Sequence, residues 1–296
     1  MSGRPRGEDG WHASVATVAL LVLLVGGCAP RRPGSAADLA RRERTAEPGP
    51  PVVVNLEGTK FTVKDLKGRP VLEADHARVS GGFSPAGDVA PIRMEQVKAT
   101  LYREGQPYLH LTAPEAVWAD GRLRADRTIR LATPDGETVL DGATGEWNAE
   151  SGEVVVTRGR SETRRRGRVE LMAEGERVVY HDAVLTIPNG GRAWQPDDGN
   201  EVRAANARFD HRSGVLTAGG GIVFTNRERT AVRAGAVEWF TRANRLRARG
   251  GVRMESPDAI ASGDRLEANT ALKRIRVIGS GRIQLRRLPR PAAQRS

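Results

Sequence analysis

The sequence predicts an all-β fold in which about seven hairpins stack into one elongated antiparallel sheet. The first observation is a repeated eight-residue segment, which begins at residues 72, 111, 140, 171, 202, 232 and 261. The spacing of about 30 residues is typical of repeat architectures, in which each unit covers the apolar face of its neighbour. The second observation is that pairs such as Asp120-Gly121, which are typical of hairpin turns, separate β-rich runs. The third is the near absence of a helical apolar stripe after the first 51 residues.

The repeated segment is apolar at its first position, usually small at its third, often small at its sixth, and large and apolar at its eighth. The copies are Leu72–Val79, Leu111–Trp118, Leu140–Trp147, Leu171–Val178, Val202–Phe209, Val232–Trp239 and Ala261–Ala268. The even period breaks between the third and sixth positions, so the strand has to bend or bulge there. We therefore predict a corner in every layer, with the aromatic residues at the eighth position in a ladder along one wall.

The segments between these copies alternate in polarity, for example at Ile222 and Phe224, which predicts strands with one solvated face. Two strands per repeat give roughly 14 strands. Two longer insertions, Ser80–Pro91 and Pro188–Asn200, are interpreted as loops. The strand region is predicted to cover residues 52–286, and a division into halves at 52–187 and 201–286 is left open.

The composition favours an elongated protein, because 39% hydrophobic and 4% aromatic residues are few for a compact globule. The formal charge of +11 suits a nucleic acid, an anionic membrane or an acidic ligand. The arginines are scattered, which favours a solvated surface instead. The densest basic run, Arg164–Arg166, reads as a solvated hairpin tip or as a contact to lipid phosphates.

No catalytic or metal-binding cluster is predicted. The single cysteine excludes an intramolecular disulfide and metal sites built on paired cysteines. The histidines fall in different repeats, where surface or strand positions are the simpler interpretation. Nucleophile-elbow, phosphate-loop and dinucleotide motifs are absent from the sequence. A repeat enzyme would need clustered carboxylates, which do not occur, so we predict a protein that is not an enzyme and has no cofactor.

The first 51 residues predict export and anchoring. Ala13–Val25 is a mostly apolar run, shorter than the roughly 20 residues of a transmembrane helix, and fits the hydrophobic part of a signal peptide. Val25–Cys28 resembles the lipobox of bacterial lipoproteins, with Cys28 as the lipidated residue. The alternatives are a plain signal peptide and an uncleaved anchor. We predict a signal helix over 1–27, a flexible tether over 28–51 and a basic disordered tail over 287–296.

The segment Phe61–Val79 resembles the start of the LptC-type domain of lipopolysaccharide transport. The recurring cadence of alanines, tryptophan and turn over residues 52–286 is similar to the OstA-like domain shared by LptA and LptC proteins. This resemblance implies a β-jellyroll with a V-shaped groove that holds lipopolysaccharide acyl chains. It also implies joining to other Lpt-type jellyrolls through edge strands. The apparent lipidation and the longer folded region depart from the best-known LptC proteins, so the membrane that holds the anchor, inner or outer, stays open.

We therefore predict a periplasmic, lipid-anchored protein that binds lipopolysaccharide or a similar glycolipid and relays it toward the outer membrane. The alternative is a scaffold that assembles through edge strands without binding lipid, and nucleic acid is not an expected partner. Each groove candidate could equally be an ordinary core residue. The candidates are Leu111, Trp118, Leu131, Trp147, Phe209, Phe224, Trp239 and Met254.

Overall fold

The computed structural model describes residues 52–56, 60–75, 78–83 and 91–286. The predicted signal segment, Cys28, the tether and the tail 287–296 lie outside the described residues, as does His76. In the described part of the chain, no helix has the length and apolar character needed to cross a membrane. All regular elements described are β-strands, which confirms the predicted all-β class.

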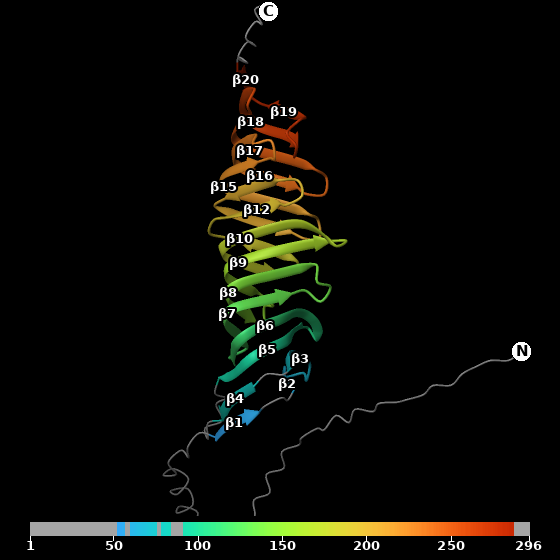
Figure 1. The fold of residues 1–296 in the computed structure, drawn as a ribbon, viewed down its shortest axis with the longest axis vertical. Coiled ribbons are helices and arrows are strands. Elements are labelled where there is room, and N and C mark those ends of the chain that lie inside the picture. The colour runs from blue at the N-terminus through green and yellow to red at the C-terminus, as the bar shows by residue number, and fades with distance from the viewer. Residues whose placement is uncertain (1–51, 57–59, 76–77, 84–90, 287–296) are drawn as a thin grey trace, which may run out of the picture. The chain divides into compact units, whose positions relative to one another are not determined.

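Twenty strands form one sheet, and every pairing is antiparallel. Figure 1 shows them stacked in chain order from β1 to β20. The strands are β1 Val52–Leu56, β2 Phe61–Lys64, β3 Pro70–Asp75, β4 Arg78–Phe83, β5 Ile92–Arg103, β6 Gln106–Ala119, β7 Arg122–Ala132, β8 Thr138–Asn148, β9 Val154–Arg165, β10 Arg168–His181, β11 Val184–Ile187, β12 Gly191–Gln195, β13 Asn200–Ala204, β14 Asn206–Asp210, β15 Val215–Thr225, β16 Ala231–Phe240, β17 Arg245–Glu255, β18 Ala259–Asn269, β19 Ile275–Ile278 and β20 Arg282–Leu285.

In five places, two consecutive short strands together form one long strand that is interrupted midway. β11 and β12 both pair with β10, and β13 and β14 both pair with β15. β19 and β20 share β18 in the same way, and β3 and β4 share β5. With β1 and β2 paired to β4 and β3, the twenty strands make fifteen long passes. This agrees with the roughly 14 strands predicted from the repeats.

The long strands whose middles are described bend there. In β6 the register shifts between Thr112 and Glu115, which lies between the third and sixth positions of the repeat that begins at residue 111. The register shifts at the equivalent place in β16, between Arg233 and Ala236. Residues at the bend adopt left-handed backbone angles, as at Arg127 with a φ of 62°. The predicted corner is therefore confirmed in these strands, and it is built from β-bulges that turn the strand.

The bend divides the sheet into two walls. The first wall contains β2, β3, β12, β13, β20 and the part of each long strand on their side of the bend. The second wall contains β1, β4, β11, β14, β19 and the remaining parts. The hairpin tips of the two walls face each other on the side opposite the bend, and we call the space between these two rows of tips the mouth.

One predicted loop is wrong. The segment Pro188–Asn200 contains strand β12, Gly191–Gln195, which pairs with β10 and β13. Its Pro, Asn and Gly residues make the bend at Gly190, and its Asp and Gly residues make the tip at Gly199. The sheet consequently runs on from β10 to β15. In the other insertion, Ser80–Phe83 belongs to β4, and residues 84–90 lie outside the described residues.

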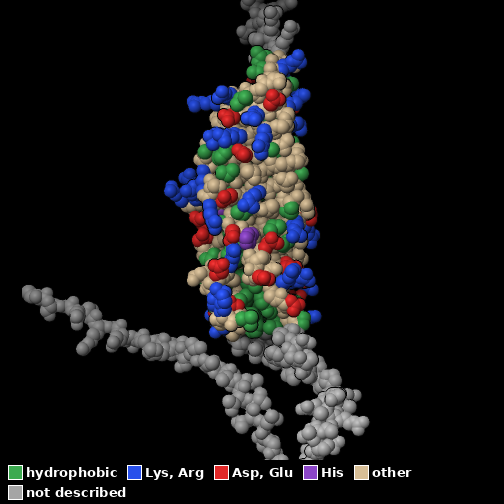
Figure 2. Space-filling view, turned by 180° about the vertical axis from the view of Figure 1, so that it is seen from behind, with side chains coloured by type: hydrophobic (Ala, Val, Ile, Leu, Met, Phe, Trp, Pro, Cys, Tyr) green, Lys and Arg blue, Asp and Glu red, His purple; other side chains and the backbone are tan. Residues whose placement is uncertain are grey.

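The outer surface is charged and mixed. Figure 2 shows basic and acidic side chains interspersed over one face of the molecule. Among the surface ion pairs, Arg130 bonds Asp141 at 3.2 Å and Arg122 bonds Glu146 at 2.7 Å. The basic run Arg164–Arg166 does form a hairpin tip, between β9 and β10. This distribution agrees with the scattered arginines of the sequence.

Candidate functional site

The inner surface of the second wall carries one continuous row in which aromatic and aliphatic residues alternate from strand to strand. The row exists because each of these residues is the register partner of the next across the sheet. It runs Trp118, Leu123, Trp147, Val154, Tyr180, Leu185, Phe209, Leu216, Trp239 and Leu246. The aromatic ladder predicted from the eighth position of the repeat is confirmed.

Tyr180 belongs to this ladder, and the sequence analysis missed it. The predicted copy Leu171–Val178 is wrong by two residues, because register partners place the first position of this repeat at Ala173 and its eighth at Tyr180. The Leu171–Val178 copy is also the loosest in spelling. The alternation of Val178 and Tyr180 after the bend is the signal that could have placed Tyr180 in the row.

The inner surface of the first wall carries a second row, which is small in its centre and larger toward both ends. Ser161, Ala173 and Ala193 form the small central part. The row runs Leu111, Leu131, Leu140, Ser161, Ala173, Ala193, Val202, Phe224, Val232, Met254 and Ala261.

The eight groove candidates all lie in these two facing rows, four in each. Trp118 is half-buried, and the other seven are between 0% and 6% exposed. The structure therefore places them together on the inner surfaces of the walls, where they pack as core residues. Their contact with lipid stays a prediction.

The space between the walls is filled by these side chains. The apolar hollow lined by Leu111, Leu131 and Trp147 has a volume of about 10 Å³. That is room for about one water molecule. The lengthwise groove is thus closed in this structure, and an acyl chain can enter only if the walls move apart.

The mouth is closed by polar side chains that reach from one wall to the other. Arg103 pairs with Asp182, and this bond lowers the pKa of Asp182. Farther along, Arg242 Nε bonds Glu170 Oε1 at 2.7 Å. We call these two links and five others the seam. The others are Thr138 Oγ1 to His211 Nδ1 at 3.0 Å, Thr163 Oγ1 to His211 Nδ1 at 3.5 Å, Thr241 Oγ1 to Glu170 Oε1 at 3.0 Å, Asn226 Nδ2 to the Ala271 carbonyl at 2.9 Å and Lys273 Nζ to Glu228 Oε1 at 3.2 Å.

Backbone hydrogen bonds do not cross the mouth among the described residues. At the tips they join neighbours on one wall, as from His211 N to the Ala183 oxygen at 2.9 Å and from Thr241 N to the Gly214 oxygen at 3.0 Å. Every described bond across the mouth uses at least one side chain. The walls can therefore separate at the mouth without the loss of any ladder hydrogen bond.

Polar groups lie just inside the seam. The Tyr108 and Tyr180 rings are 6.1 Å apart, and the Tyr180 ring is 5.9 Å from that of His211. Burial lowers the pKa of His211 to about 4 and raises the pKa of both tyrosines. Tyr108 Oη and His211 Nε2 are buried without a hydrogen-bond partner among the described residues. The sequence treated His211 as an ordinary surface or strand residue and did not identify this cluster.

The described residues contain no group of three or more His, Cys, Asp or Glu side chains placed to hold a metal ion. The interior between the walls is apolar, with a few polar atoms just inside the seam.

Comparisons with known proteins complete the description. No protein-family model matches the chain, and no curated protein sequence matches it. Among solved structures, the chain is similar to the crystal structure of LptH from Pseudomonas aeruginosa, described as the LptA homologous periplasmic component of the conserved lipopolysaccharide transport device. The two share 12% identity with a TM-score of 0.35, over 40% of this chain and 95% of that chain.

The two ends of the sheet are open among the described residues. β19 and β20 pair only with β18, and β1 and β2 pair only with β4 and β3. The C-terminal edge exposes large apolar side chains, with Ile283 68% and Leu285 77% exposed. An unpaired apolar edge can accept a strand from another chain.

Proposed function

We propose that this protein is a periplasmic, lipid-anchored carrier that holds the acyl chains of lipopolysaccharide or a similar glycolipid between its two walls. The chains enter through the mouth, and the sugars stay in water outside it. Cys28 carries the anchor, and the protein performs no covalent chemistry on the lipid. The resemblance of the repeat cadence to OstA-like domains supports the choice of glycolipid.

The observation that carries the proposal is the way in which the interior is enclosed. Two continuous apolar rows face each other over the length of the sheet, and the mouth between them is joined only through side chains. The bend on the opposite side is continuous backbone, so it can act as the hinge.

The energy of opening can be compared with that of loading. Seven residue pairs across the mouth, at roughly 0.5–1.5 kcal/mol each, amount to about 4–10 kcal/mol. A buried acyl chain contributes about 0.8 kcal/mol per methylene, so about 12 methylenes contribute roughly 10 kcal/mol. The side-chain contacts between the walls are replaced by contacts to the chain. One or two acyl chains are therefore sufficient to hold the mouth open.

The proposal is tested by tying the mouth shut. Arg103→Cys and Asp182→Cys place a thiol on each wall, in a Cys28→Ser background that removes the single native cysteine. A short bifunctional thiol reagent then joins the two tips. We expect the cross-linked protein to lose at least about tenfold in the rate at which it takes up a fluorescent fatty-acyl probe, because the walls can no longer part.

The matched control is Arg130→Cys with Asp141→Cys. This is also an Arg–Asp pair, at 3.2 Å, but it joins adjacent strands on the outer face of the first wall. Cross-linking it should leave probe uptake unchanged. Equal uptake by the mouth-linked and control-linked proteins would refute entry through the mouth.

A second candidate function rests on the open C-terminal edge. Ile275, Ile278, Ile283 and Leu285 are all exposed on β19 and β20. A scaffold that assembles end to end through this edge would need no lipid in its interior. Purified protein that forms linear oligomers and contains no co-purifying glycolipid would favour the scaffold over the carrier.

A further inference from the structure

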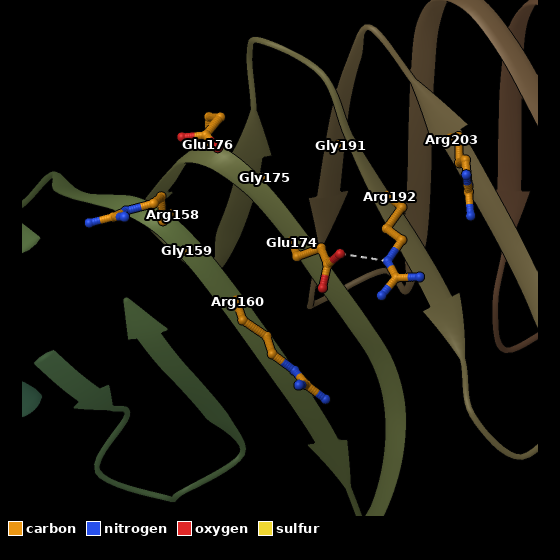
Figure 3. Close-up of a pocket in the computed structure, with 9 residues that line it drawn as sticks. All are labelled: Arg158, Gly159, Arg160, Glu174, Gly175, Glu176, Gly191, Arg192 and Arg203. Atoms are coloured by element: carbon orange, nitrogen blue, oxygen red, sulfur yellow. Dashed lines mark hydrogen bonds and ion pairs between the residues drawn. The ribbon is translucent and has the colours of Figure 1, made fainter. Parts of the chain in front are cut away.

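A second hollow lies on the outer side of the bend, away from the mouth. It is a cleft of about 600 Å³ on β9, β10, β12 and β13. The backbone of Gly159, Gly175 and Gly191 forms its floor, and these glycines are register partners across three adjacent strands. Figure 3 shows arginine and glutamate side chains standing around this floor.

The floor is fixed by the core beneath it. A Cβ atom on Gly175 would lie 2.6 Å from Ile187 Cγ2, and one on Gly159 would lie 2.8 Å from Val178 Cγ2. Both contacts are far shorter than normal packing allows, so the bend needs glycine at these positions. The cleft floor is therefore held in place by the packing of the inner wall.

The charges around the cleft are unequal. Four arginines and two glutamates line it. Arg192 Nε bonds Glu174 Oε1 at 2.6 Å, and Glu174 lies between Arg160 and Arg192 in Figure 3. Arg203 pairs with Glu201 beside the cleft. Within the described part of the chain, Arg158 and Arg160 form no ion pair.

The two arginines without a carboxylate partner flank the same floor glycine. Arg158 and Arg160 precede and follow Gly159, and Arg158 has a φ of 46°, a left-handed angle that is uncommon for a residue with a side chain. The Arg160 guanidinium lies 5.7 Å from the Trp194 ring centroid, which supports it from one side. In Figure 3 the two guanidinium groups extend to different sides of Gly159, so each offers hydrogen-bond donors to a different part of a ligand.

We propose that this cleft binds a phosphate group carried by a hydroxyl-rich molecule, either a sugar phosphate or a polyol phosphate headgroup. Arginine donates paired hydrogen bonds that match phosphate oxygens. The exposed Glu176 accepts hydrogen bonds from hydroxyl groups of the same ligand. The hollow is shallow and open to solvent, which leaves room for a ligand that stays largely hydrated. Because the cleft and the mouth lie on opposite sides of the sheet, this proposal does not depend on acyl-chain binding.

Titration calorimetry of the full-length protein in detergent tests the site with three probes: inorganic phosphate, a hexose phosphate and the unphosphorylated hexose. We expect saturable binding of the hexose phosphate, weaker binding of inorganic phosphate, and none of the neutral hexose. Arg158→Gln with Arg160→Gln should weaken hexose phosphate binding by at least about tenfold, since it removes two charge-assisted contacts. Glu176→Ala should remove the advantage of the hexose phosphate over inorganic phosphate.

The control is Arg245→Gln with Arg247→Gln, which removes the same charge from two arginines that stack on Phe240 on another part of the surface. It should leave phosphate binding unchanged. Equal loss in the control, or binding of the neutral hexose as tight as that of its phosphate, overturns the proposal. So does the absence of saturable binding by either phosphate compound.

Vesicles distinguish the two sources of the ligand. In a Cys28→Ser background, which removes the proposed anchor, sedimentation with phosphatidylglycerol vesicles but not with phosphatidylcholine vesicles, lost in the Arg158/Arg160 variant and kept in the control, identifies a lipid headgroup. Hexose phosphate binding without vesicle binding identifies a soluble or polymeric sugar phosphate. Uptake of the fatty-acyl probe, measured on the same variants, should be unchanged, which separates failure of this site from failure of the interior and shows that the variants fold.

Discussion

His211 should make the stability of the protein depend on pH, through its position behind the seam. Burial lowers its pKa from 6.5 to about 4, and its Nδ1 atom lies within hydrogen-bond distance of Thr138 Oγ1, at 3.0 Å. Above pH 6.5 the imidazole is neutral in both the folded and unfolded chains and contributes no pH dependence. As the pH falls from 6.5 to about 4, only the unfolded chain takes up a proton, so stability is lost in this window.

The magnitude follows from these two pKa values. Between pH 8 and pH 5 the loss of unfolding free energy is about 2 kcal/mol, and below pH 4 it approaches about 3 kcal/mol. The charges near His211 are Glu170, Asp210, Asp135 and Arg242. The carboxylates favour protonation and Arg242 opposes it, but burial has the largest effect.

Urea unfolding of the wild-type protein and of His211→Gln, each at pH 8 and pH 5, measures this contribution. Glutamine does not titrate and can still accept a hydrogen bond from Thr138. The wild-type protein should lose about 2 kcal/mol more than the variant between the two pH values. Equal losses in both proteins would show that His211 is not held neutral by burial.

Three further changes have defined outcomes. Cys28→Ser should abolish acyl labelling and membrane association in cell fractionation, and full retention on the membrane would exclude lipidation at this residue. Gly175→Ala should lower the unfolding free energy by about 1–3 kcal/mol, because the added methyl group meets Ile187; a neutral result in urea unfolding would show that the bend has room. Trp239→Ala should lower the unfolding free energy by about 3–5 kcal/mol, because the Trp239 side chain is 0% exposed. Ile283→Ala should change the unfolding free energy by less than about 0.5 kcal/mol, because Ile283 is 68% exposed. Similar losses for these last two would contradict the assigned interior.

The bend and the rows could be predicted from the sequence because both depend on the spacing of apolar and small residues along a single strand. Alternation fixes which residues face inward, and the break between Ala113 and Ala116 fixes where the strand turns. These are local properties of one strand. For the same reason, Leu131 and Trp147 could be assigned to the interior before their partners across the sheet were known.

The seam could not be predicted in the same way. Arg103 and Asp182 are far apart in sequence, and their contact depends on how the two walls lean toward each other. Neither residue belongs to a motif. An arginine or an aspartate at a hairpin tip usually faces solvent, so nothing in the sequence indicated that they pair. The closed interior was not predicted either, since packing between the walls is a tertiary property. Prediction of the outer cleft would have required knowing that Gly159, Gly175 and Gly191 are register partners on adjacent strands. Strand register cannot be read from the sequence alone.

The central claim is that lipid lies between the walls, and photo-crosslinking in cells tests it most directly. A photoreactive amino acid at Leu131 or Phe209 faces inward, and one at Arg130 or Arg208, the preceding residue of the same strand, faces outward. Irradiation should join a glycolipid to the two inward positions, detected as a mass-shifted, glycolipid-reactive band, and to neither outward position. Crosslinks at Arg130 and Arg208 with none at Leu131 and Phe209 would contradict the account.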